Sequence, residues 1–530
     1  MIKVRQFSMS KNVKIEIDCN AVIYRAVDSD RHYTFAQVKA AATAFGEGLR
    51  NLWDWQRGDV IALFSPNDVD YAAVIYGTFF AGGTVTPANP VYSADELAFQ
   101  LTNSDAKAVI TTRQFLQTAV KAAKQAGIPQ DRVILLGAQR DETHRIKHWT
   151  NIRKTSGALR YKRRKMHPEK EIAFLAYSSG TTGLPKGVML SHKNVVADVL
   201  MIQGCVGKWY KSGQDKFLGV LPFFHIYGLT GLVHQMLYRG IELLVMPAFN
   251  LDVFLRTIQD HKITFVYVAP PVIVRLARDS IVDNYDLSSI RMITCGAAPL
   301  TKELVDTVHK RLSIKINQAY GLSETSPMTH TQPWDEWYSS VGSVGKMFPN
   351  MTAMYMSPEG KELGPGEVGE LWLKGPNVFK GYLKNPEATK DSITAERFFK
   401  TGDVGYQDEN HNFYITDRVK ELIKYKGFQV APAELEGKLM DHPNVNDVAV
   451  IGIEDEEQHT EVPRAYVVAA NGKEKEDADE IVKWTAERVA SHKRLRGGVV
   501  FIDEIPKSAS GKILRRILKE KAKQEKKAKL

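Results

Sequence analysis

The stretch YSSGTTGLPKGVMLSH, residues 177–192, decides how the rest of the chain is interpreted. The apolar run IAFLA at 172–176 precedes it and predicts a short buried strand. Hydroxyls, glycines and a lysine then follow on one short loop. This set suits a polyphosphate, because glycines let the backbone curl around oxygens, hydroxyls donate and the lysine neutralises charge. The candidate phosphate-binding residues are Ser178, Ser179, Gly180, Thr181, Thr182 and Lys186.

The loop admits two other interpretations. It is not a Walker loop, because Lys186 is followed by Gly187 and Val188 rather than by a Ser or Thr that opens a helix. An ordinary flexible turn is the second, since clusters of Ser, Thr and Gly usually form loops. The order of a strand, a polar loop and a lysine favours a phosphate-binding loop over an ordinary turn.

Composition excludes several classes of protein. With 530 residues, 44% hydrophobic and 25% charged, the chain is typical of a soluble protein of three or four compact units. Its three cysteines, Cys19, Cys205 and Cys295, form neither a metal spacing nor a disulfide framework, and each is expected to be a small buried hydrophobe.

The N-terminus lacks the apolar core of a signal peptide. The charge-poor windows 71–94 and 217–238 contain Gly, Pro or His, and we expect buried core rather than membrane spans.

The net charge of +10 is concentrated locally. Eight Lys or Arg and two Glu lie in 513–530, and RYKRRK at 160–165 is a second basic run. Neither run has the interleaved aromatics of a nucleic-acid footprint, so we expect a solvated tail and a solvated loop.

Alternating strands and helices predict the fold class. Runs at 60–64, 84–87, 108–110 and 133–136, and then at 217–220, 243–246, 265–268 and 292–295, predict two doubly wound α/β layers. The polar segment 139–170 is the expected connection between them. Short strands and Gly/Pro turns beyond Gly342 predict a small β-rich subdomain. A new α+β pattern after the lysine-dense segment 419–430 predicts a mobile C-terminal domain, with the boundary at 418–420.

Six motifs in order carry a family resemblance. They are the opening loop, FFHIYG (223–228), QAYGLSE (318–324), KTGD (400–403), DRVKELIKYKGFQV (417–430) and PKSASGKILRR (506–516). Together the motifs resemble the adenylate-forming superfamily, and VAPAELE (430–436) with LRGGVVF (495–501) is similar to its 4-coumarate–CoA ligase and beetle-luciferase branch. The resemblance implies an N-terminal AMP-binding domain (1–417), a hinge (418–420) and a C-terminal domain (421–530).

The resemblance also implies the reaction and its residues. A carboxylic acid and ATP with Mg²⁺ would give acyl-AMP and pyrophosphate, and coenzyme A would then give the thioester. Lys512, His225 and Glu324 are the implied catalytic residues, Glu324 also helping to hold the metal. The implied nucleotide-binding residues, besides the loop, are Gln318, Ala319, Tyr320, Ser323, Asp403 and Arg418. The hinge and thioester step would use Lys420, Lys424, Lys426, Gly427 and Gln429.

The expected acyl pocket is mostly apolar, with several small residues. It comprises Tyr227, Gly228, Gly231, Gly296, Ala297, Gly321, Pro327 and Met328, and suits an aryl or medium-chain acid. No cation is evident to pair with a second charge on the substrate, which disfavours diacids and amino acids. Two positions depart from the plant ligases: Ala319 replaces a common Gly, and Ala248 replaces a Lys, which weakens the assignment of a CoA phosphate contact there.

Three alternatives remain open on the sequence. The chain could be a luciferase-like oxygenase, a carrier-loading adenylating enzyme, or a nucleotide-binding protein without ligase activity. No carrier motif is present. The C-terminus, Ala528-Lys529-Leu530, is similar to the Ser-Lys-Leu peroxisomal address and predicts a peroxisomal import receptor as a partner. The oligomeric state and the physiological acid are not predicted.

Overall fold

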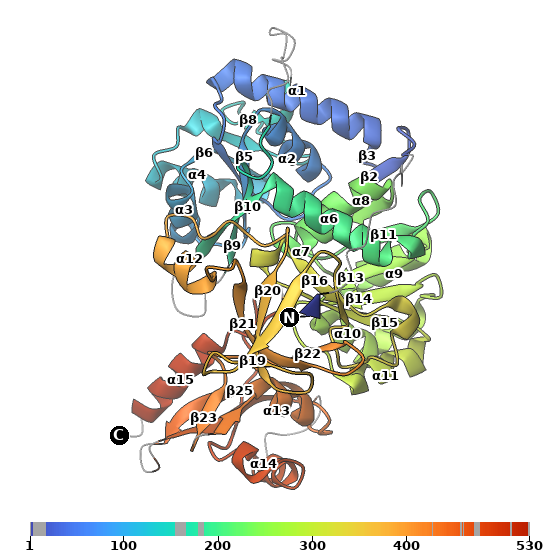
Figure 1. Ribbon diagram of the computed structural model, residues 1–530. Coiled ribbons are helices and arrows are strands. Elements are labelled where there is room, and N and C mark those ends of the chain that lie inside the picture. Colours follow the sequence, from blue (N-terminus) through green and yellow to red (C-terminus); the bar gives the residue numbers. More distant parts are fainter. Residues whose placement is uncertain are drawn as a thin grey trace.

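The structure is a computed structural model that describes residues 2–3, 17–153, 166–178, 185–426, 428–455, 458, 460–470, 478–508 and 511–527. It has a large upper part and a smaller C-terminal domain below it (Figure 1). The expected loop residues Ser179, Gly180, Thr181 and Thr182, the basic run 160–165, Gly427 and the C-terminal Ala528–Leu530 lie outside the described residues, and the side chain of Gln429 is likewise not described.

A seven-stranded sheet forms the first doubly wound subdomain. Its order is β10-β9-β5-β4-β6-β7-β8, parallel throughout except for the β9–β10 hairpin at one edge. The strands are β4 (Val60–Phe64), β5 (Thr84–Ala88), β6 (Ala106–Thr111), β7 (Val133–Leu135), β8 (Lys147–His148), β9 (Ile172–Ser178) and β10 (Lys186–Ser191). The helices of this unit are α2 (Tyr71–Phe80), α3 (Ala94–Asn103), α4 (Leu116–Gln125) and α5 (Trp149–Arg153).

A nine-stranded sheet forms the second subdomain, in the order β17-β16-β15-β14-β13-β11-β12-β2-β3. The strands are β2 (Val22–Ala26), β3 (His32–Thr34), β11 (Lys216–Gly219), β12 (Glu242–Val245), β13 (Phe265–Val268), β14 (Met292–Cys295), β15 (Ile316–Gly321), β16 (Met328–Thr331) and β17 (Lys346–Met347). Its helices are α6 (His192–Val206), α7 (Ile226–Gly228), α8 (Gln235–Arg239), α9 (Leu251–His261), α10 (Pro270–Arg278) and α11 (Lys302–Leu312), with a π-helical turn, η4 (Leu229–His234), between α7 and α8.

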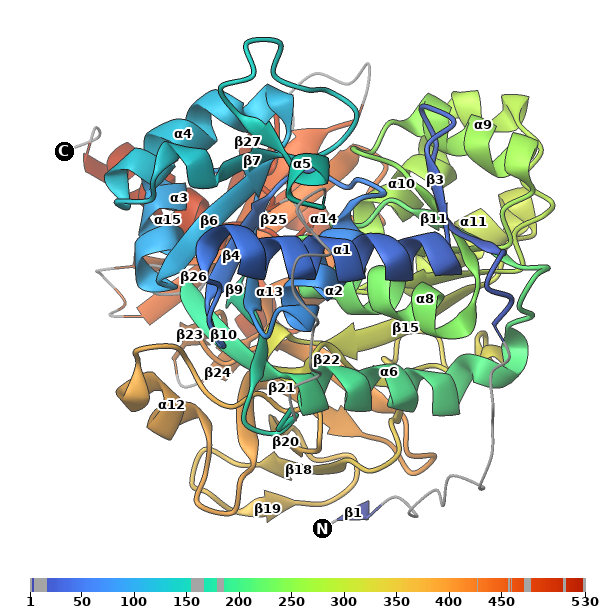
Figure 2. The same ribbon diagram turned by 90° about the horizontal axis from the view of Figure 1, so that it is seen from above.

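Helices lie between the two sheets and join the subdomains into one core. α1 (Phe35–Trp53) and α2 run across the middle of the molecule in Figure 2. Seven of the eight residues of α2 from Tyr71 to Thr78 are buried. A helix that is apolar all round is buried on every side, which explains why the window 71–94 looked membrane-like. None of the described helices is long and apolar enough to span a bilayer.

The β-rich subdomain and the C-terminal domain complete the chain. The former is a six-stranded sheet with main order β1-β18-β20-β21-β22, β19 pairing with β18. It comprises β1 (Ile2–Lys3), β18 (Thr352–Met356), β19 (Glu362–Leu363), β20 (Gly369–Lys374), β21 (Phe399–Gln407) and β22 (Phe413–Arg418). The C-terminal domain has the hairpin β23 (Ile423–Tyr425)–β24 (Phe428–Val430), the sheet β25 (Val445–Asp455), β26 (Thr460–Ala469) and β27 (Val499–Phe501), and helices α13 (Pro432–Leu439), α14 (Ala478–Ala486) and α15 (Arg515–Lys527).

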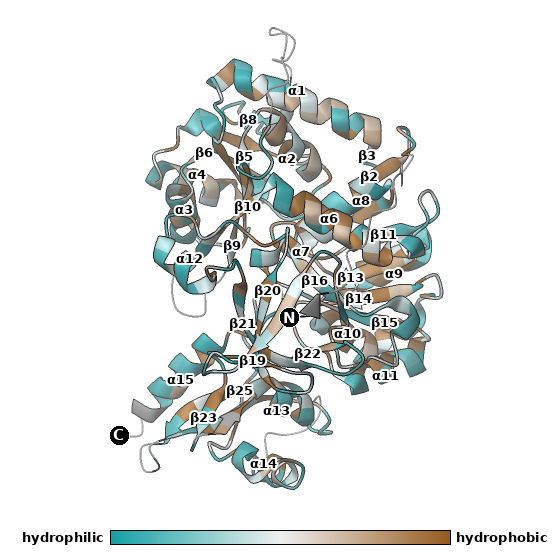
Figure 3. Cartoon of the chain, viewed as in Figure 1, coloured by the Kyte–Doolittle hydropathy of each residue, from teal (hydrophilic) through white to brown (hydrophobic). Residues whose placement is uncertain are grey.

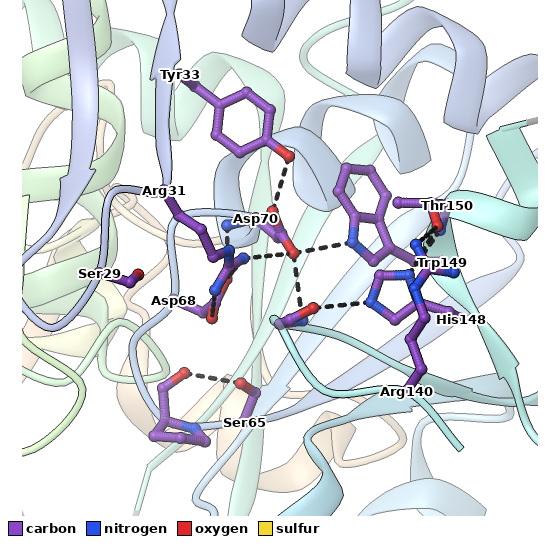
Figure 4. Close-up of polar contacts among 12 residues, drawn as sticks. Ser29, Arg31, Tyr33, Ser65, Asp68, Asp70, Arg140, His148, Trp149 and Thr150 are labelled. Atoms are coloured by element: carbon purple, nitrogen blue, oxygen red, sulfur yellow. Dashed lines mark hydrogen bonds and ion pairs between the residues drawn. The ribbon is translucent and has the colours of Figure 1, made fainter. Parts of the chain in front are cut away.

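A buried aspartate fastens the two doubly wound subdomains together (Figure 4). Asp70, just before α2, pairs with Arg31 of the β2–β3 hairpin at 2.8 Å. It also accepts hydrogen bonds from Tyr33 Oη at 2.8 Å and from Trp149 Nε1 at 2.9 Å. Arg31 bridges to Asp68 as well, with two contacts of 2.9 Å. Because its donors come from segments on both sheets, this carboxylate fixes their relative position.

Three expectations need correction. The segment 139–170 is not merely a connection, because β8 extends the first sheet and Trp149 is fully buried against Phe45 of α1. The basic tail is not simply solvated: α15 covers 515–527 and buries Leu518 in the C-terminal core, while its outer face stays hydrophilic (Figure 3). Cys19 is exposed rather than buried.

Candidate active site

The predicted phosphate loop is the tip of a β-hairpin. β9 and β10 pair with Ser178 opposite Lys186, so the two ends of the loop lie side by side. A strand follows the lysine, and helix α6 begins only at His192, capped by Ser191. The hairpin therefore differs from a Walker loop, in which the lysine opens a helix.

Lys186 and Glu324 are connected through Tyr382, a residue that the sequence had not singled out. Lys186 Nζ lies 5.1 Å from the centroid of the Tyr382 ring, and the hydroxyl of Tyr382 donates to Glu324 Oε1 at 2.9 Å. Tyr382 is held by backbone bonds between 381–383 and β10, among them Met189 N to Gly381 O at 3.0 Å. This pairing places the Lys186 ammonium and the Glu324 carboxylate on the same tyrosine, one at its ring and the other at its hydroxyl.

Asp403 is the centre of a second cluster. It lies on β21, opposite Arg418 of β22, and is only 3% exposed. Arg418 Nε donates to Asp403 Oδ1 at 3.0 Å, and Tyr320 Oη donates to Asp403 Oδ2 at 2.5 Å. Burial raises the pKa of the Tyr320 phenol, and the neighbouring carboxylate adds to the effect, so Tyr320 stays a donor.

The C-terminal domain brings Lys512 to these residues. The turn 508–512 closes with Ser508 N to Lys512 O at 2.8 Å, and Gly511 has φ +80°. Gly511 lies against the start of α10: a Cβ added there would be 3.2 Å from Pro271 Cδ and 3.4 Å from Ala269 Cβ. A side chain at this position would be strained by the backbone conformation and would press on Pro271.

Charged groups from several parts of the chain surround Lys512. Burial lowers the pKa of Lys512, and nearby Arg418 lowers it further, whereas Asp403, Glu324 and Glu421 oppose the shift. One ammonium thus interacts with groups from the second sheet, the β-rich subdomain and its own domain. An anion bound beside Lys512 would favour its charged form.

His225 lies near Lys512, and its imidazole is neutral. Burial lowers its pKa to about 3, with Lys512 adding to the shift. Its Nδ1 accepts from Tyr227 N at 3.3 Å, so the remaining proton is on Nε2, which is left as a donor. The segment is held by Asn67, whose Oδ1 accepts from Phe223 N at 2.7 Å and whose Nδ2 donates to Leu221 O at 3.0 Å.

Four of the expected acyl-pocket residues lie close together, namely Tyr227, Gly231, Gly296 and Met328. The rings of Tyr227 and Tyr267 are stacked, with centroids 5.9 Å apart. A Cβ at Gly231 would contact both the Tyr267 ring and Met328 Cε at 3.4 Å. A Cβ at Gly296 would lie 3.3 Å from the Tyr227 ring. These contacts define a narrow wall of aromatic and small residues.

Two of the predicted pocket glycines have another role. A Cβ at Gly228 would lie 2.3 Å from Pro222 O, and one at Gly321 would lie 2.0 Å from Pro327 O. Both positions are therefore fixed by the close approach of backbone to backbone. They shape the loops around the pocket rather than widen it.

A buried cation that the sequence did not indicate lies behind the aromatic wall. Arg239 of α8 is 4% exposed, and its guanidinium carbon is 4.1 Å from the centroid of the Tyr210 ring. The Tyr210 hydroxyl is hydrogen-bonded to that of Tyr267 at 2.8 Å. Sequence spacing could not reveal this, because Arg239 lies beyond the recognised motif and reaches the wall through two tyrosines.

The residues assigned to the thioester step are not part of this cluster. Lys420, Lys424 and Lys426 are exposed. Their hairpin is bonded within the C-terminal domain, Lys424 N donating to Glu461 Oε2 and Lys426 N to Thr460 Oγ1, each at 2.8 Å. Gln318, by contrast, is buried in β15, and its Nε2 has no hydrogen-bond partner among the described residues.

Sequence comparison identifies the family. Residues 11–383 match the family described as AMP-binding enzyme, and residues 434–512 match the AMP-binding enzyme C-terminal domain. A probable 4-coumarate–CoA ligase of Dictyostelium discoideum is 38% identical over 89% of this chain and 87% of its own length. A 4-coumarate–CoA ligase of Vanilla planifolia is 38% identical over 93% of this chain and 89% of its own.

Solved structures agree in fold. ATP-bound MatB from Rhodopseudomonas palustris has a TM-score of 0.84 at 28% identity, covering 95% of this chain and 96% of that one. The score falls to 0.74 for the same protein without ATP, at 27% identity over 95% and 96% of the two chains. The o-succinylbenzoate CoA synthetase of Bacillus subtilis with its acyl-adenylate scores 0.80 at 27% identity, over 95% of each chain. The chain therefore belongs to the AMP-binding enzyme family and is an AMP-forming acid–CoA ligase.

Proposed function

We propose that this enzyme activates a compact aromatic carboxylic acid and that the structure corresponds to its acyl-AMP-forming arrangement. The observation that carries the proposal is the position of Lys512, which one domain places among Asp403, Glu324, Arg418 and His225 of the other. The chain resembles MatB with ATP bound more closely than MatB without ATP, and this supports the acyl-AMP-forming arrangement.

The first half-reaction follows from the charges. A carboxylate must attack an α-phosphate that is itself negative, so the site must offset negative charge as the bond forms. We assign Lys512 to both anions, as a compact point charge. Neutral His225 would donate from Nε2 to the carboxylate and keep it in line. Asp403 would accept from the ribose hydroxyls, steadied by Tyr320 and Arg418.

The phosphates would lie along the β9–β10 hairpin. Lys186 and Ser178 are at its described ends, and Ser179–Thr182 are assigned to it from the sequence. Magnesium would fit at Glu324, because Mg²⁺ is commonly held by one or two carboxylates plus substrate phosphates, and Glu324 Oε2 accepts no hydrogen bond from the described residues. When bound there, the ion would neutralise phosphate charge.

The second half-reaction requires the C-terminal domain to move. We assign to Lys512 the side from which coenzyme A would approach, whereas Lys424 and Gln429 belong to the separate β23–β24 hairpin and Lys426 follows β23. Gly427 is assigned to the same step from the sequence alone. Rotation about Lys420 would exchange the two segments, as lid and domain motions do in other enzymes.

The pocket wall supports an aryl acid over a medium-chain fatty acid. Behind Tyr227 and Tyr267 the rings of Phe217, Phe265 and Trp334 pack on one another, with centroid distances from 4.9 to 5.3 Å. These packed rings leave little room for a flexible chain that continues past Tyr267. A single planar ring would stack on Tyr227.

The test is a panel of carboxylic acids assayed with ATP, Mg²⁺ and CoA for AMP and for thioester. We expect pyrophosphate release only when acid and ATP are both present, with aryl acids turned over faster than C8–C12 fatty acids. Faster turnover of the fatty acids would contradict the substrate class. AMP release without any CoA consumption would contradict the ligase assignment.

We also propose a peroxisomal location, supported by the C-terminal Ala528-Lys529-Leu530. A fluorescent protein fused to the last dozen residues should accumulate in peroxisomes. The same fusion ending in Ala-Lys-Asp should stay in the cytosol. A wild-type fusion that remains cytosolic would contradict the proposal.

A further inference from the structure

The loop from Glu324 to Met328 takes part in two regions of the proposed site. Glu324, at its start, is the residue assigned to magnesium. Met328, at its end, belongs to the acyl wall, where its Cε would lie 3.4 Å from a Cβ at Gly231. Thr325 and Ser326 between them are fully buried. Buried backbone carbonyls need hydrogen-bond donors, so the group that supplies those donors helps to set where both ends of the loop lie.

Asn377, which is itself fully buried, supplies two of these donors. Its Nδ2 donates to Thr325 O at 2.7 Å and to Met328 O at 3.0 Å. Its backbone oxygen accepts from Ser326 Oγ at 2.8 Å. A single asparagine therefore binds three of the five residues of the loop.

The backbone around this asparagine is fixed from two directions. Phe379 N donates to Glu324 O at 2.8 Å. Asn194 Nδ2, in the first turn of α6, donates to Pro376 O and to Val378 O, each at 2.8 Å. Helix α6 directly follows β10, so the β9–β10 hairpin and the 324–328 loop are both held to the same short segment, 376–379.

Asp198, one helical turn beyond Asn194 on α6, orients the amide of Asn377. It is fully buried, and its Oδ1 accepts from Asn377 Nδ2 at 3.2 Å. With the two loop carbonyls, three oxygen atoms thus surround Nδ2, which fixes the nitrogen rather than the oxygen of the amide towards the loop. Burial raises the pKa of the Asp198 carboxyl, which favours its neutral form, although bonds from Asn377 and the Met328 backbone oppose the shift.

We propose that Asn377 is a positioning residue for acyl-AMP formation, which holds the 324–328 loop so that Glu324 meets the metal-bound nucleotide while Met328 keeps its place in the acyl wall. Asp198 is a second positioning residue, which orients the amide of Asn377. Both act through the loop rather than on a substrate. This inference rests on the proposed function, because it takes Glu324 as the residue that meets magnesium.

Direct binding of ATP tests the proposal without turnover. The dissociation constant of the full-length enzyme for ATP is measured by calorimetry in EDTA and in saturating Mg²⁺, with no acid present. The first constant divided by the second is the magnesium gain. Asn377→Ala should reduce the magnesium gain about fivefold to tenfold, as expected for one buried hydrogen bond, and leave the constant in EDTA unchanged. An unchanged magnesium gain would overturn the proposal.

A double-mutant cycle separates positioning from general damage to the fold. Glu324→Gln should lose the magnesium gain on its own. Adding Asn377→Ala to it should cause no further loss, because Asn377 acts through Glu324. Additive losses, or weaker ATP binding in EDTA, would show that Asn377 has a merely structural role.

The other end of the loop gives an independent readout. In Asn377→Ala the KM for the acid should rise about fivefold, because Met328 loses the same donor. An unchanged KM for the acid would overturn the part of the proposal that concerns the acyl wall.

Variants of Asp198 keep the proposal testable if Asn377→Ala does not fold. Asp198→Asn is uncharged and keeps an oxygen that can accept from Nδ2, so it should retain the wild-type magnesium gain. Asp198→Ala removes that acceptor and should reduce the gain about twofold to fivefold. Equal losses in the two variants, or no loss in Asp198→Ala, would overturn the orienting role of Asp198.

Asn412→Ala is the matched control. Asn412 is 7% exposed, and its Nδ2 donates to Asp408 Oδ2 at 3.1 Å within the turn between β21 and β22. This variant loses a hydrogen bond of the same kind away from the 324–328 loop and should keep the full magnesium gain. A reduced gain in Asn412→Ala would show that any buried asparagine has this effect, which would overturn the proposal.

The two levels of inference fail differently. If the wild-type enzyme has no magnesium gain, or if Glu324→Gln keeps it, the magnesium assignment in the proposed function is wrong and this inference falls with it. If Glu324→Gln loses the gain and Asn377→Ala keeps it, only the positioning role is wrong.

Discussion

Replacing Gly511 by alanine should slow acyl-AMP formation and spare thioester formation. The change has two separable costs. Holding alanine at φ +80° costs about 1–2 kcal/mol in every conformation of the C-terminal domain. The contact with Pro271, 3.2 Å from the added Cβ, arises only when Lys512 is docked.

The size of the docking cost sets the expected rate. A tight extra methyl in a packed contact costs about 1–2 kcal/mol, near the lower end of measured overpacking. Each 1.4 kcal/mol is a factor of ten, so acid-dependent pyrophosphate release should fall about 5- to 30-fold. Thioester formation from supplied acyl-AMP needs no docked Lys512 and should be unchanged.

Gly498→Ala is the matched control for this measurement. Gly498 lies in the same domain at φ +78°, and a Cβ there would have no heavy atom within 4 Å. It therefore reports the backbone cost alone and should leave both half-reactions intact, with only a lower unfolding midpoint. If Gly511→Ala slowed both half-reactions equally, or if Gly498→Ala slowed the first as much, the docking contact would not be the cause.

Three further outcomes follow from the same contacts. Lys512→Ala should reduce acyl-AMP formation about 100-fold or more while preserving thioester formation from supplied acyl-AMP, and loss of both would refute the two-arrangement scheme. Tyr320→Phe removes one donor to Asp403 and should raise the KM for ATP about tenfold; a fall in kcat with KM unchanged would contradict that role. Burial lowers the pKa of His225, His234 and His330 to about 3 each. Each therefore stays neutral in the fold while the unfolded chain takes up protons below about pH 6.5, so stability should fall on acidification by up to about 1.4 kcal/mol per pH unit per histidine. In urea titrations from pH 7 to 4, His330→Phe should make that decline shallower, and an unchanged slope would contradict the assignment.

Regular patterns made the layers predictable from sequence. The β9 run, the buried strand 60–64 and the change of texture beyond Gly342 all appeared where local periodicity implied them. The limits of the domains and the roles of the site residues stay predictions, to be tested by the half-reactions above.

Long-range contacts account for what the sequence left out. Tyr382 was recognisable only as part of a turn, because its link to Glu324 depends on the 381–383 segment pairing with β10. Asp70 was an unremarked residue before a helix until donors from two sheets met on it. Arg239 lacks any motif. Glu324 is 58 residues from Tyr382, and Trp149 is 79 residues from Asp70, so these contacts lie beyond the reach of local spacing.

The chain crosses between the two catalytic parts once among the described residues, in the turn between Arg418, at the end of β22, and Ile423, at the start of β23. Everything else that joins them, including the seat of Gly511 on Pro271, is non-covalent. The enzyme is therefore suited to being split into two polypeptides at this turn. In the split enzyme, the rate of acyl-AMP formation would depend on the concentrations of the two halves. In the intact chain the linker gives each half an effective concentration on the order of millimolar near the other, and separate halves would have to reach a similar concentration.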